Sequence, residues 1–384
     1  MKKVLLGTSA LALVGAYAGT ATAAEFEVKV GGYFEAYAAY ADSDVDNVTG
    51  EEYGGIDSKR DSEIHFKPSI TLDNGIKIGA DIQLEGSSGT SDTIDEAYLF
   101  IRGSFGEVLL GSENSAGYKM TYAAPDVTFV NVNSGSLTAF VPFSGIAGDG
   151  PATVGGPVAT GADVFRGTLG STFLENGRNN DAERFTYFTP RFGGVQFGVS
   201  YARDGLQDNN AQLDINGRSL TNIVDFGANF VQSFGPVDIA VSGRYGIAFD
   251  DAPGDDPEIY AFGANVGFFG VTIGGSFAEQ NNAGFDDGQS YDAGVSYTTG
   301  PWGVSFTYFH GSNVDEESAF NGAAFGNDEE LDQYLLGVTY KLAKGVTLLG
   351  FGAYVDFQED TGDAGGSGDD VDGFVIGTGI KISF

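Results

Sequence analysis

The sequence predicts an all-β protein, an antiparallel up-and-down β-barrel of sixteen strands that crosses a membrane. The first observation behind this prediction is a two-residue alternation of apolar and polar side chains, which recurs down to the last residue. Successive side chains of a strand point to opposite faces of a sheet, so each such segment has one apolar and one polar face. Short and long connections also alternate between these segments, and aromatic residues gather at their ends.

The alternation is clearest in residues 61–73, where Ile64 and Phe66 alternate with Glu63 and His65. Segments of this kind, rich in β-branched and aromatic residues, are typical of strands. In chain order, the sixteen predicted strands span about 26–41, 61–73, 76–86, 93–104, 107–112, 183–190, 195–203, 220–233, 237–249, 258–268, 271–280, 289–298, 303–310, 331–341, 346–357 and 371–384.

The connections between the predicted strands fall into two classes. Seven are short, and the Asn74-Gly75 pair in one of them is typical of a tight β-hairpin. Eight are long, polar and acidic, so both chain ends fall on the side of the short turns. In 346–357 the adjacent Leu348 and Leu349 break the alternation, and a β-bulge there would restore it. The long connections span about 42–60, 86–92, 113–182, 204–219, 250–257, 281–288, 311–330 and 358–370.

Two architectures compete for this pattern. In a secreted β-sandwich the apolar faces pack against each other, whereas in an outer-membrane barrel they point outward and the interior is wet. Charges on the opposite face of nearly every strand favour the barrel, and so do aromatic residues at both strand ends, which resemble membrane-interface girdles. A membrane barrel must close to pair its edges, so 371–384 should pair with 26–41. The aromatic residues are Phe105, Phe192, Phe234, Phe269, Trp302 and Phe384 near short turns, and Tyr40, Tyr201, Phe249, Tyr291 and Phe309 near long connections.

The N-terminus has the three parts of a secretory signal peptide: the basic Lys2 and Lys3, an apolar stretch, and a small-residue cleavage pattern at 21–23. We therefore expect residues 1–23 to be removed and residues 24–384 to form one barrel domain. The chain carries 53 acidic and 19 basic residues, which argues against nucleic acid as a partner. It contains no cysteine, so no disulfide bond supports the fold.

Four motifs in a fixed order carry a resemblance to a known family. They are FGEVLLGS at 105–112, YAAPDV at 122–127, FTPRFGGVQFGVSY at 188–201 and the terminal GTGIKISF at 377–384. The mature chain resembles the general, trimeric, sixteen-stranded porins of Gram-negative outer membranes, in particular the branch of purple and other alphaproteobacteria. The resemblance implies a homotrimer in outer-membrane lipid, a diffusion channel and a third long extracellular loop folded into the barrel. The terminal Phe384 is similar to the family's assembly signal.

The third long connection, 113–182, corresponds to that inward-folded loop, and a loop of this length in a compact domain is usually either functional or disordered. We expect its carboxylates to form one side of a pore constriction, facing basic side chains of the wall. The bases have a second interpretation, because cross-strand ion pairs with neighbouring wall acids are common in sheets. The predicted loop acids are Glu113, Asp126, Asp163 and Glu175, and the predicted wall bases are Lys29, Lys67, Lys77, Arg102, Arg184 and Arg244.

Metal binding and enzyme activity have less support in the sequence. Acidic clusters in the long connections, at 250–251, 255–256 and 369–372, would suit Ca²⁺ or Mg²⁺, but solvated loop charges are the simpler explanation. We expect no other cofactor. The sequence contains no G-x-S-x-G or H-E-x-x-H motif and no Gly-rich phosphate loop before a helix, so we expect no enzyme activity.

The predicted function is a water-filled outer-membrane pore through which ions and small hydrophilic solutes diffuse passively. Polar groups and water in the lumen spare the solute the cost of entering hydrocarbon. The acidic chain predicts a preference for cations. Two alternatives are a porin that binds one specific solute in its loop and, from another class, a secreted β-sandwich or adhesin.

Overall fold

The computed structural model describes residues 25–46, 53–86, 94–141, 167–175, 181–205, 220–250, 256–281, 287–314, 328–360 and 370–384. The predicted signal peptide, residues 1–23, lies outside these stretches, and so does Asp163. Within the described stretches, no helix is both long enough and apolar enough to cross a membrane.

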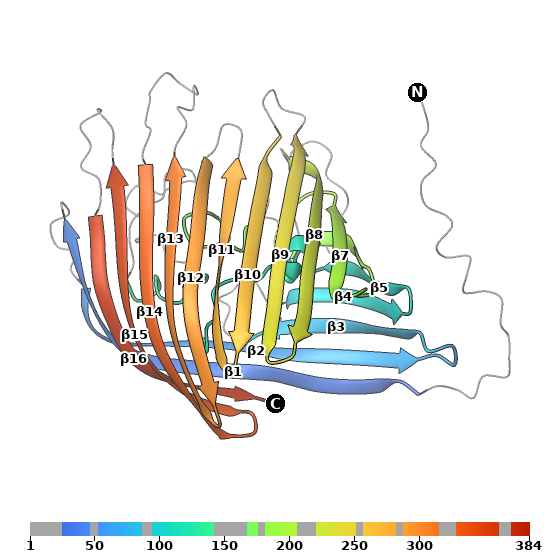
Figure 1. Ribbon diagram of the computed structural model, residues 1–384, viewed down its shortest axis with the longest axis horizontal. Helices are drawn as coiled ribbons and strands as arrows, with labels where there is room; N and C mark the ends of the chain where they lie inside the picture. Colours follow the sequence, from blue (N-terminus) through green and yellow to red (C-terminus); the bar gives the residue numbers. More distant parts are fainter. Residues whose placement is uncertain are drawn as a thin grey trace.

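Sixteen antiparallel strands close into a single ring (Figure 1). The strands are β1 (Glu27–Asp46), β2 (Tyr53–Thr71), β3 (Lys77–Glu85), β4 (Ile94–Gly103), β5 (Gly106–Ser112), β6 (Glu183–Phe188), β7 (Val195–Ala202), β8 (Leu220–Phe234), β9 (Val237–Asp250), β10 (Glu258–Phe268), β11 (Val271–Asn281), β12 (Asp287–Thr299), β13 (Trp302–Val314), β14 (Asp328–Ala343), β15 (Val346–Asp360) and β16 (Asp370–Ser383). Each strand pairs with its neighbours in sequence, and β1 pairs with β16. The ring confirms the predicted up-and-down barrel and excludes the two-sheet sandwich.

The barrel strands are strongly tilted. In Figure 1 the blue strands β1–β3 run across the yellow and orange strands β9–β14, as expected for opposite walls of such a barrel. The side chains of one strand alternate between the outside and the inside of the barrel, so each wall has an inner face that differs from its outer face.

The seam of the barrel joins the two ends of the chain. The N–H of Phe384 donates to the carbonyl of Gly32, and the N–H of Gly32 donates to the carbonyl of Phe384, each over 3.1 Å. Gly32 has a φ of +150°, and a Cβ at this position would overlap the carbonyl oxygen of Glu63. Glycine therefore lets β1, β2 and the chain end meet at this point. The ring of Phe384 is exposed, and its role as an assembly signal stays a prediction.

The predicted Asn74-Gly75 hairpin joins β2 to β3. Gly75 has a φ of +81°, which strains any residue other than glycine. Its N–H donates to the carbonyl of Leu72 over 2.8 Å, and the Asn74 side chain accepts from the N–H of Ile76 over 3.1 Å. The chain thus forms the tight turn that the Asn74-Gly75 pair predicted.

Apolar residues cover the outer face of the barrel, as the alternation predicted. A belt of tyrosines runs over β13, β14 and β15, where the ring centroid of Tyr334 lies 4.9 Å from that of Tyr308 and 6.4 Å from that of Tyr354. The expected place of Phe309 in such a girdle is wrong. Phe309 is fully buried inside the barrel, because odd-numbered residues of β13 face inward and its neighbour Tyr308 faces outward.

Two local features differ from the expected boundaries. β1 continues to Asp46 and β2 begins at Tyr53, so paired strands replace most of the predicted loop 42–60. The connection from β5 to β6 spans residues 113–182, as expected, but it contains the helix α1 (Ala116–Met120). Five residues are too few for a helical period to appear in a sequence, so the alternation gave no sign of α1.

Candidate pore

The long connection between β5 and β6 folds against the inner wall of the barrel. Its first limb, residues 113–141, starts with α1, and Ser115 caps this helix by accepting from the N–H of Tyr118. The limb then crosses the wall from β9 to β13, held by backbone N–H groups that donate to wall side chains. These bonds join Tyr122 to Ser242 over 2.9 Å, Ala124 to Asp292 over 2.9 Å and Val127 to Ser305 over 3.2 Å.

The second limb, residues 167–175, returns along the same wall. The N–H of Thr172 donates to the side-chain oxygen of Asn133 over 2.8 Å, so the two limbs contact each other. The hydroxyl of Thr172 also lies 2.6 Å from that of Ser276 on β11. Leu174 is fully buried among side chains of β10 and β11. Both limbs are therefore packed on the wall rather than suspended in the lumen.

A hydrophobic core fills the space between the first limb and the strands β13–β16 and β1. The loop contributes Leu137, Phe140 and Val141, and the wall contributes residues such as Phe351 and Val355 of β15. The ring centroids of Phe140 and Phe351 lie 6.5 Å apart. Close packing of this kind excludes water, as in the interior of a soluble domain.

This core corrects the expectation of a wet interior with charges on the inner face of nearly every strand. β15 pairs with β16 from Val346 to Phe357 without a shift of register, so no bulge restores the alternation at Leu348 and Leu349. Instead Leu349 faces inward and is buried, while Leu348 faces outward. Both faces of β15 are apolar because one meets the outside of the barrel and the other meets the loop.

Polar and charged side chains predominate on the inner faces of β1–β4 instead, apart from Tyr37, Ala39 and Ala41 of β1, which belong to the core. The hydroxyl of Tyr33 on β1 donates to Asp61 over 2.9 Å and to Glu63 over 2.8 Å. His65 follows on β2, with its Nε2 atom 2.8 Å from a carboxylate oxygen of Glu63. This wall therefore presents a row of carboxylates that accept from Tyr33 and contact His65.

Lysines of the same wall pair with its acids and remain accessible to water. Lys67 lies 2.8 Å from Asp81, and Lys59 lies 2.7 Å from Asp57. The side chains of Lys67 and Lys59 are 45% and 35% exposed.

We call the inner faces of β1–β4 the open wall, and the inner faces of β7–β16, against which most of the loop packs, the covered wall. The loop also contacts the open wall, at Tyr37, Ala39 and Ala41 of β1 and through Asn114, which donates to Glu96 of β4.

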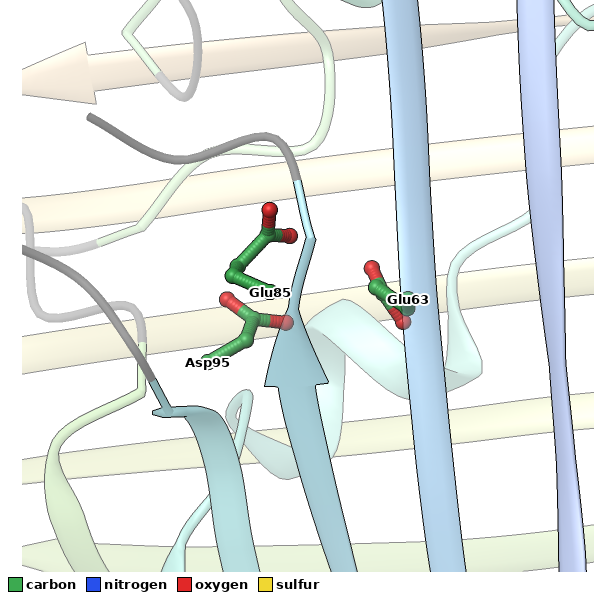
Figure 2. Close-up of side chains that lie close together, drawn as sticks. All are labelled: Glu63, Glu85 and Asp95. Carbon is green, nitrogen blue, oxygen red and sulfur yellow. The ribbon is translucent and has the colours of Figure 1, made fainter.

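Three carboxylates of the open wall converge near its rim. Glu63 comes from β2, Glu85 from the end of β3 and Asp95 from the start of β4, and Figure 2 shows their side chains facing one another. Their nearest oxygens all lie within 4.8 Å, a spacing that could hold a metal ion. The residues are half-buried, and Glu63 already accepts from Tyr33 and contacts His65. The group adds to the negative potential at this rim.

The described loop acids of the predicted constriction are held by partners. Glu113 is buried, with a carboxylate oxygen 2.6 Å from Lys119. Asp126 accepts from the hydroxyl of Ser305 over 2.7 Å. Glu175 is buried beside Arg244 on β9, and Asp163 lies outside the described residues. The role of these acids in a constriction stays a prediction.

The predicted wall bases fall into three places. Lys67 lies on the open wall. Lys29, Lys77 and Arg102 lie near the short-turn end, where Lys29 lies 3.4 Å from Glu27, Arg102 lies 2.7 Å from Glu107, and Lys77 lies 6.0 Å from the ring centroid of Phe100. Arg184 and Arg244 are buried behind the loop. Ion pairing with neighbouring acids, the second interpretation of these bases, thus describes Lys29, Lys67, Arg102 and Arg244.

Two acids that hold the loop were not singled out from the sequence. Asp225 on β8 and Asp292 on β12 are both buried and accept backbone N–H groups of the loop, from Gly117 over 2.5 Å and from Ala124 over 2.9 Å. Each is a lone inward-facing acid on a strand whose other inward residues are small or neutral. That isolation was the available signal, since a single buried carboxylate requires a partner from elsewhere in the chain.

The chain is similar to known proteins over nearly its whole length. A family model described as Gram-negative porin matches residues 8–360. An outer membrane porin protein of Bordetella pertussis is 25% identical, with 94% of this chain and 96% of that protein covered. An uncharacterised protein of Rickettsia bellii is 22% identical, with 80% of this chain and 76% of that protein covered.

Solved structures share the architecture. An anion-selective porin from Comamonas acidovorans has a TM-score of 0.57 and 17% identity, covering 94% of this chain and all of the other. The DcaP channel of Acinetobacter baumannii has a TM-score of 0.57 and 14% identity, covering 94% and 97%. OmpT of Vibrio cholerae, in its trimer form, has a TM-score of 0.54 and 14% identity, covering 94% and 99%. At these identities the likeness establishes the fold.

Proposed function

The chain belongs to the Gram-negative porin family, and from this premise we propose that it is a cation-preferring pore for passive diffusion of ions and small hydrophilic solutes. Its family and fold are those of outer-membrane channels. The preference for cations and the passage of small solutes are the proposal.

The observation that carries the proposal is the charge of the open wall. Since most of the loop and its hydrophobic core occupy the space against the covered wall, solutes pass along the part of β1–β4 that the core leaves open. Carboxylates outnumber lysines there, and a channel lined by one sign of charge concentrates ions of the opposite sign. The acids of this wall are Glu35, Asp57, Asp61, Glu63, Asp81, Glu85, Asp95 and Glu96, of which Glu35, Asp81 and Glu96 are buried. The lysines that pair with them are Lys59, Lys67 and, from β16, Lys381, while the bases Lys29, Lys77 and Arg102 lie at the short-turn end of the same strands.

The anion selectivity of this structural relative does not determine the ion selectivity of the present chain. The Comamonas acidovorans porin shares 17% identity with this chain, which establishes the fold and leaves the lining side chains independent. Selectivity follows from charges within a few ångströms of the path, so this chain's own open wall is the relevant evidence for the proposal.

Reversal potentials in planar bilayers under a salt gradient test the proposal. We expect a potential of the sign that indicates cation preference, and a smaller preference at high salt, because charges in water are screened over about 10 Å at 0.1 M. A reversal potential of the opposite sign would overturn the cation preference. Absence of any conductance from folded protein would overturn the pore itself.

Three further features belong to the same proposal. A homotrimer in outer-membrane lipid is supported by the family and by a structural relative that forms a trimer. Export through a cleaved signal peptide at residues 1–23 is supported by the sequence of that segment. Cross-linking of protein in native membranes and N-terminal sequencing of the mature chain test these two features. No cofactor forms part of the proposal, and binding of Ca²⁺ or Mg²⁺ by the acidic connections stays a prediction.

A further inference from the structure

Arg244 on β9 is a wall residue that contacts both limbs of the loop at once. Its Nε atom donates to Asp225 on β8 over 2.8 Å. Its terminal nitrogens donate to the hydroxyl of Ser115 in the first limb over 2.9 Å, and to the carbonyl of Leu174 in the second limb. One guanidinium therefore binds a wall acid and both limbs, which are 59 residues apart in the sequence between Ser115 and Leu174.

Glu175 completes this arrangement from the second limb. One of its carboxylate oxygens lies 3.5 Å from Arg244, and the other accepts from the N–H and the hydroxyl of Ser115 over 3.4 Å and 3.3 Å. Asp225 in turn accepts the N–H of Gly117 over 2.5 Å. We call these four residues, Arg244, Asp225, Glu175 and Ser115, the clamp.

Glycines let the loop lie directly on the wall at the clamp. A Cβ at Gly117 would overlap the side chains of Arg244 and Asp225, and a Cβ at Gly227 on β8 would lie 2.9 Å from the Cα of Gly117. With no side chain at either position, α1 packs on the strand backbone. A small shift of α1 would therefore break the contacts of the clamp rather than stretch them.

The clamp is sealed from water. The side chains of Arg244, Asp225 and Glu175 are 1%, 2% and 0% exposed. A buried charge is costly unless it is paired and hydrogen-bonded; Arg244 and Asp225 pair within the wall, whereas Glu175 reaches Arg244 only when the second limb is in place. The arrangement holds both limbs of the loop against the covered wall.

We propose that Arg244 is a positioning residue that holds both limbs of the loop at one point and thereby keeps the path along the open wall clear. The proposal rests on the pore function described above. When the clamp is broken, the loop is released toward β1–β4 and interrupts the current.

Variants that release one limb at a time test the clamp in single-channel recordings. Glu175→Gln removes a charge from the second limb and Ser115→Ala removes an acceptor from the first, while both leave the Arg244–Asp225 pair in the wall. Arg244→Gln releases both limbs. Since each lost bond involves a charged partner, we expect interruptions of the open level to become at least about tenfold more frequent, and most frequent in Arg244→Gln.

Matched controls lie at the short-turn end, away from the loop. Arg191→Gln removes a guanidinium that donates to Gly194 and Gln196, and Ser233→Ala removes a hydroxyl that donates to Asp238. Both control variants should show interruptions of the open level as rarely as the unmodified protein does. Interruptions that rise equally in the controls and in the clamp variants would overturn the proposal.

A reversible disulfide bond between the loop and the wall distinguishes a displaced loop from a general destabilisation of the barrel. An ideal Cβ at Gly337 on β14 would lie 3.4 Å from the Cβ of Thr128 in the first limb, close to the separation of about 3.5–4.5 Å in disulfides. The chain has no cysteine of its own, so Thr128→Cys with Gly337→Cys forms one defined bond. In the Arg244→Gln or Glu175→Gln background, oxidation should restore the quiet open level and a reductant should abolish it again.

The results of these experiments distinguish a failure of the pore function from a failure of the clamp. An unmodified protein without conductance would overturn the pore function. A conducting protein whose clamp variants are as quiet as the unmodified one would overturn the clamp and leave the pore function intact. Interruptions that persist in the tethered, oxidised variants would also overturn the clamp, because the loop would then be held in place without effect.

Discussion

The covered wall and the open wall of this barrel share one backbone architecture and carry opposite chemistry. Val355 on the covered wall is fully buried against loop side chains, whereas Lys67 on the open wall is 45% exposed. The difference arises because the loop fills one side of the lumen with a hydrophobic core and leaves the other side wet. A strand pattern alone cannot reveal this, since each strand faces inward in the same way on both walls.

A carboxylate placed on each wall in turn should give the largest difference in stability between the two walls. Val355→Asp buries a carboxylate in the core between loop and wall, and we expect a loss of about 3–5 kcal/mol or failure to form the barrel. Thr71→Asp places the same group on the inner face of β2, where the side chain is exposed and Lys77 is the cross-strand neighbour. Unfolding in urea, followed by the fluorescence of the single Trp302, should distinguish the two variants. Equal stabilities would contradict the division into two walls.

A truncation in the loop should have the next largest effect. Phe140→Ala removes a buried ring that packs on Phe351, and we expect a loss of about 3–5 kcal/mol, as for other core aromatics. Ile56→Ala on the outer face of β2, where the side chain is 82% exposed, serves as the control and should cost much less. The same urea titration measures both. A loop that merely hangs in the lumen would give the Phe140 variant the stability of the control.

The ion selectivity of the pore should change when an acid is removed from the open wall and not when one is removed from the covered wall. This effect is smaller in free energy than the two stability effects above. Asp57→Asn removes an exposed acid of the open wall next to Lys59, so the reversal potential should move toward anion preference. Asp292→Asn makes the same change on the covered wall, where the acid is buried and bonded to Ala124 and Asn133. We expect lower stability from the second variant and nearly unchanged selectivity. Equal shifts in the two reversal potentials would mean that ions pass both walls.

Much of the fold could be predicted from the sequence, because the outward alternation depends only on local strand geometry. The Asn74-Gly75 turn and the closure of β1 on β16 follow from equally local or topological rules. Leu349 and Phe309 show where such reasoning stops. Their inward apolar side chains are explained by contacts with a loop distant in sequence, and no period within β15 or β13 carries that information.

The candidate pore was less accessible to prediction for the same reason. The sequence indicated acids and bases of the right kind, such as Glu175 and Arg244, and the structure brings these two together. It could not indicate that their pairing would be buried behind the loop rather than displayed in the lumen. The side chains that line the water-accessible wall, Asp57, Asp61 and Glu63 among them, lie on strands whose alternation looks like that of every other strand.

Chemical accessibility of the two walls tests the central claim most directly. His65→Cys places a thiol on the open wall and Thr307→Cys places one on the covered wall, where Thr307 is 1% exposed, and the chain contributes no other cysteine. A small, charged, thiol-specific reagent added during single-channel recording should change the conductance of the His65→Cys pore within the recording and leave the Thr307→Cys pore unchanged. A change in conductance of the Thr307→Cys pore, with none in the His65→Cys pore, would contradict the assignment of the conducting path to β1–β4.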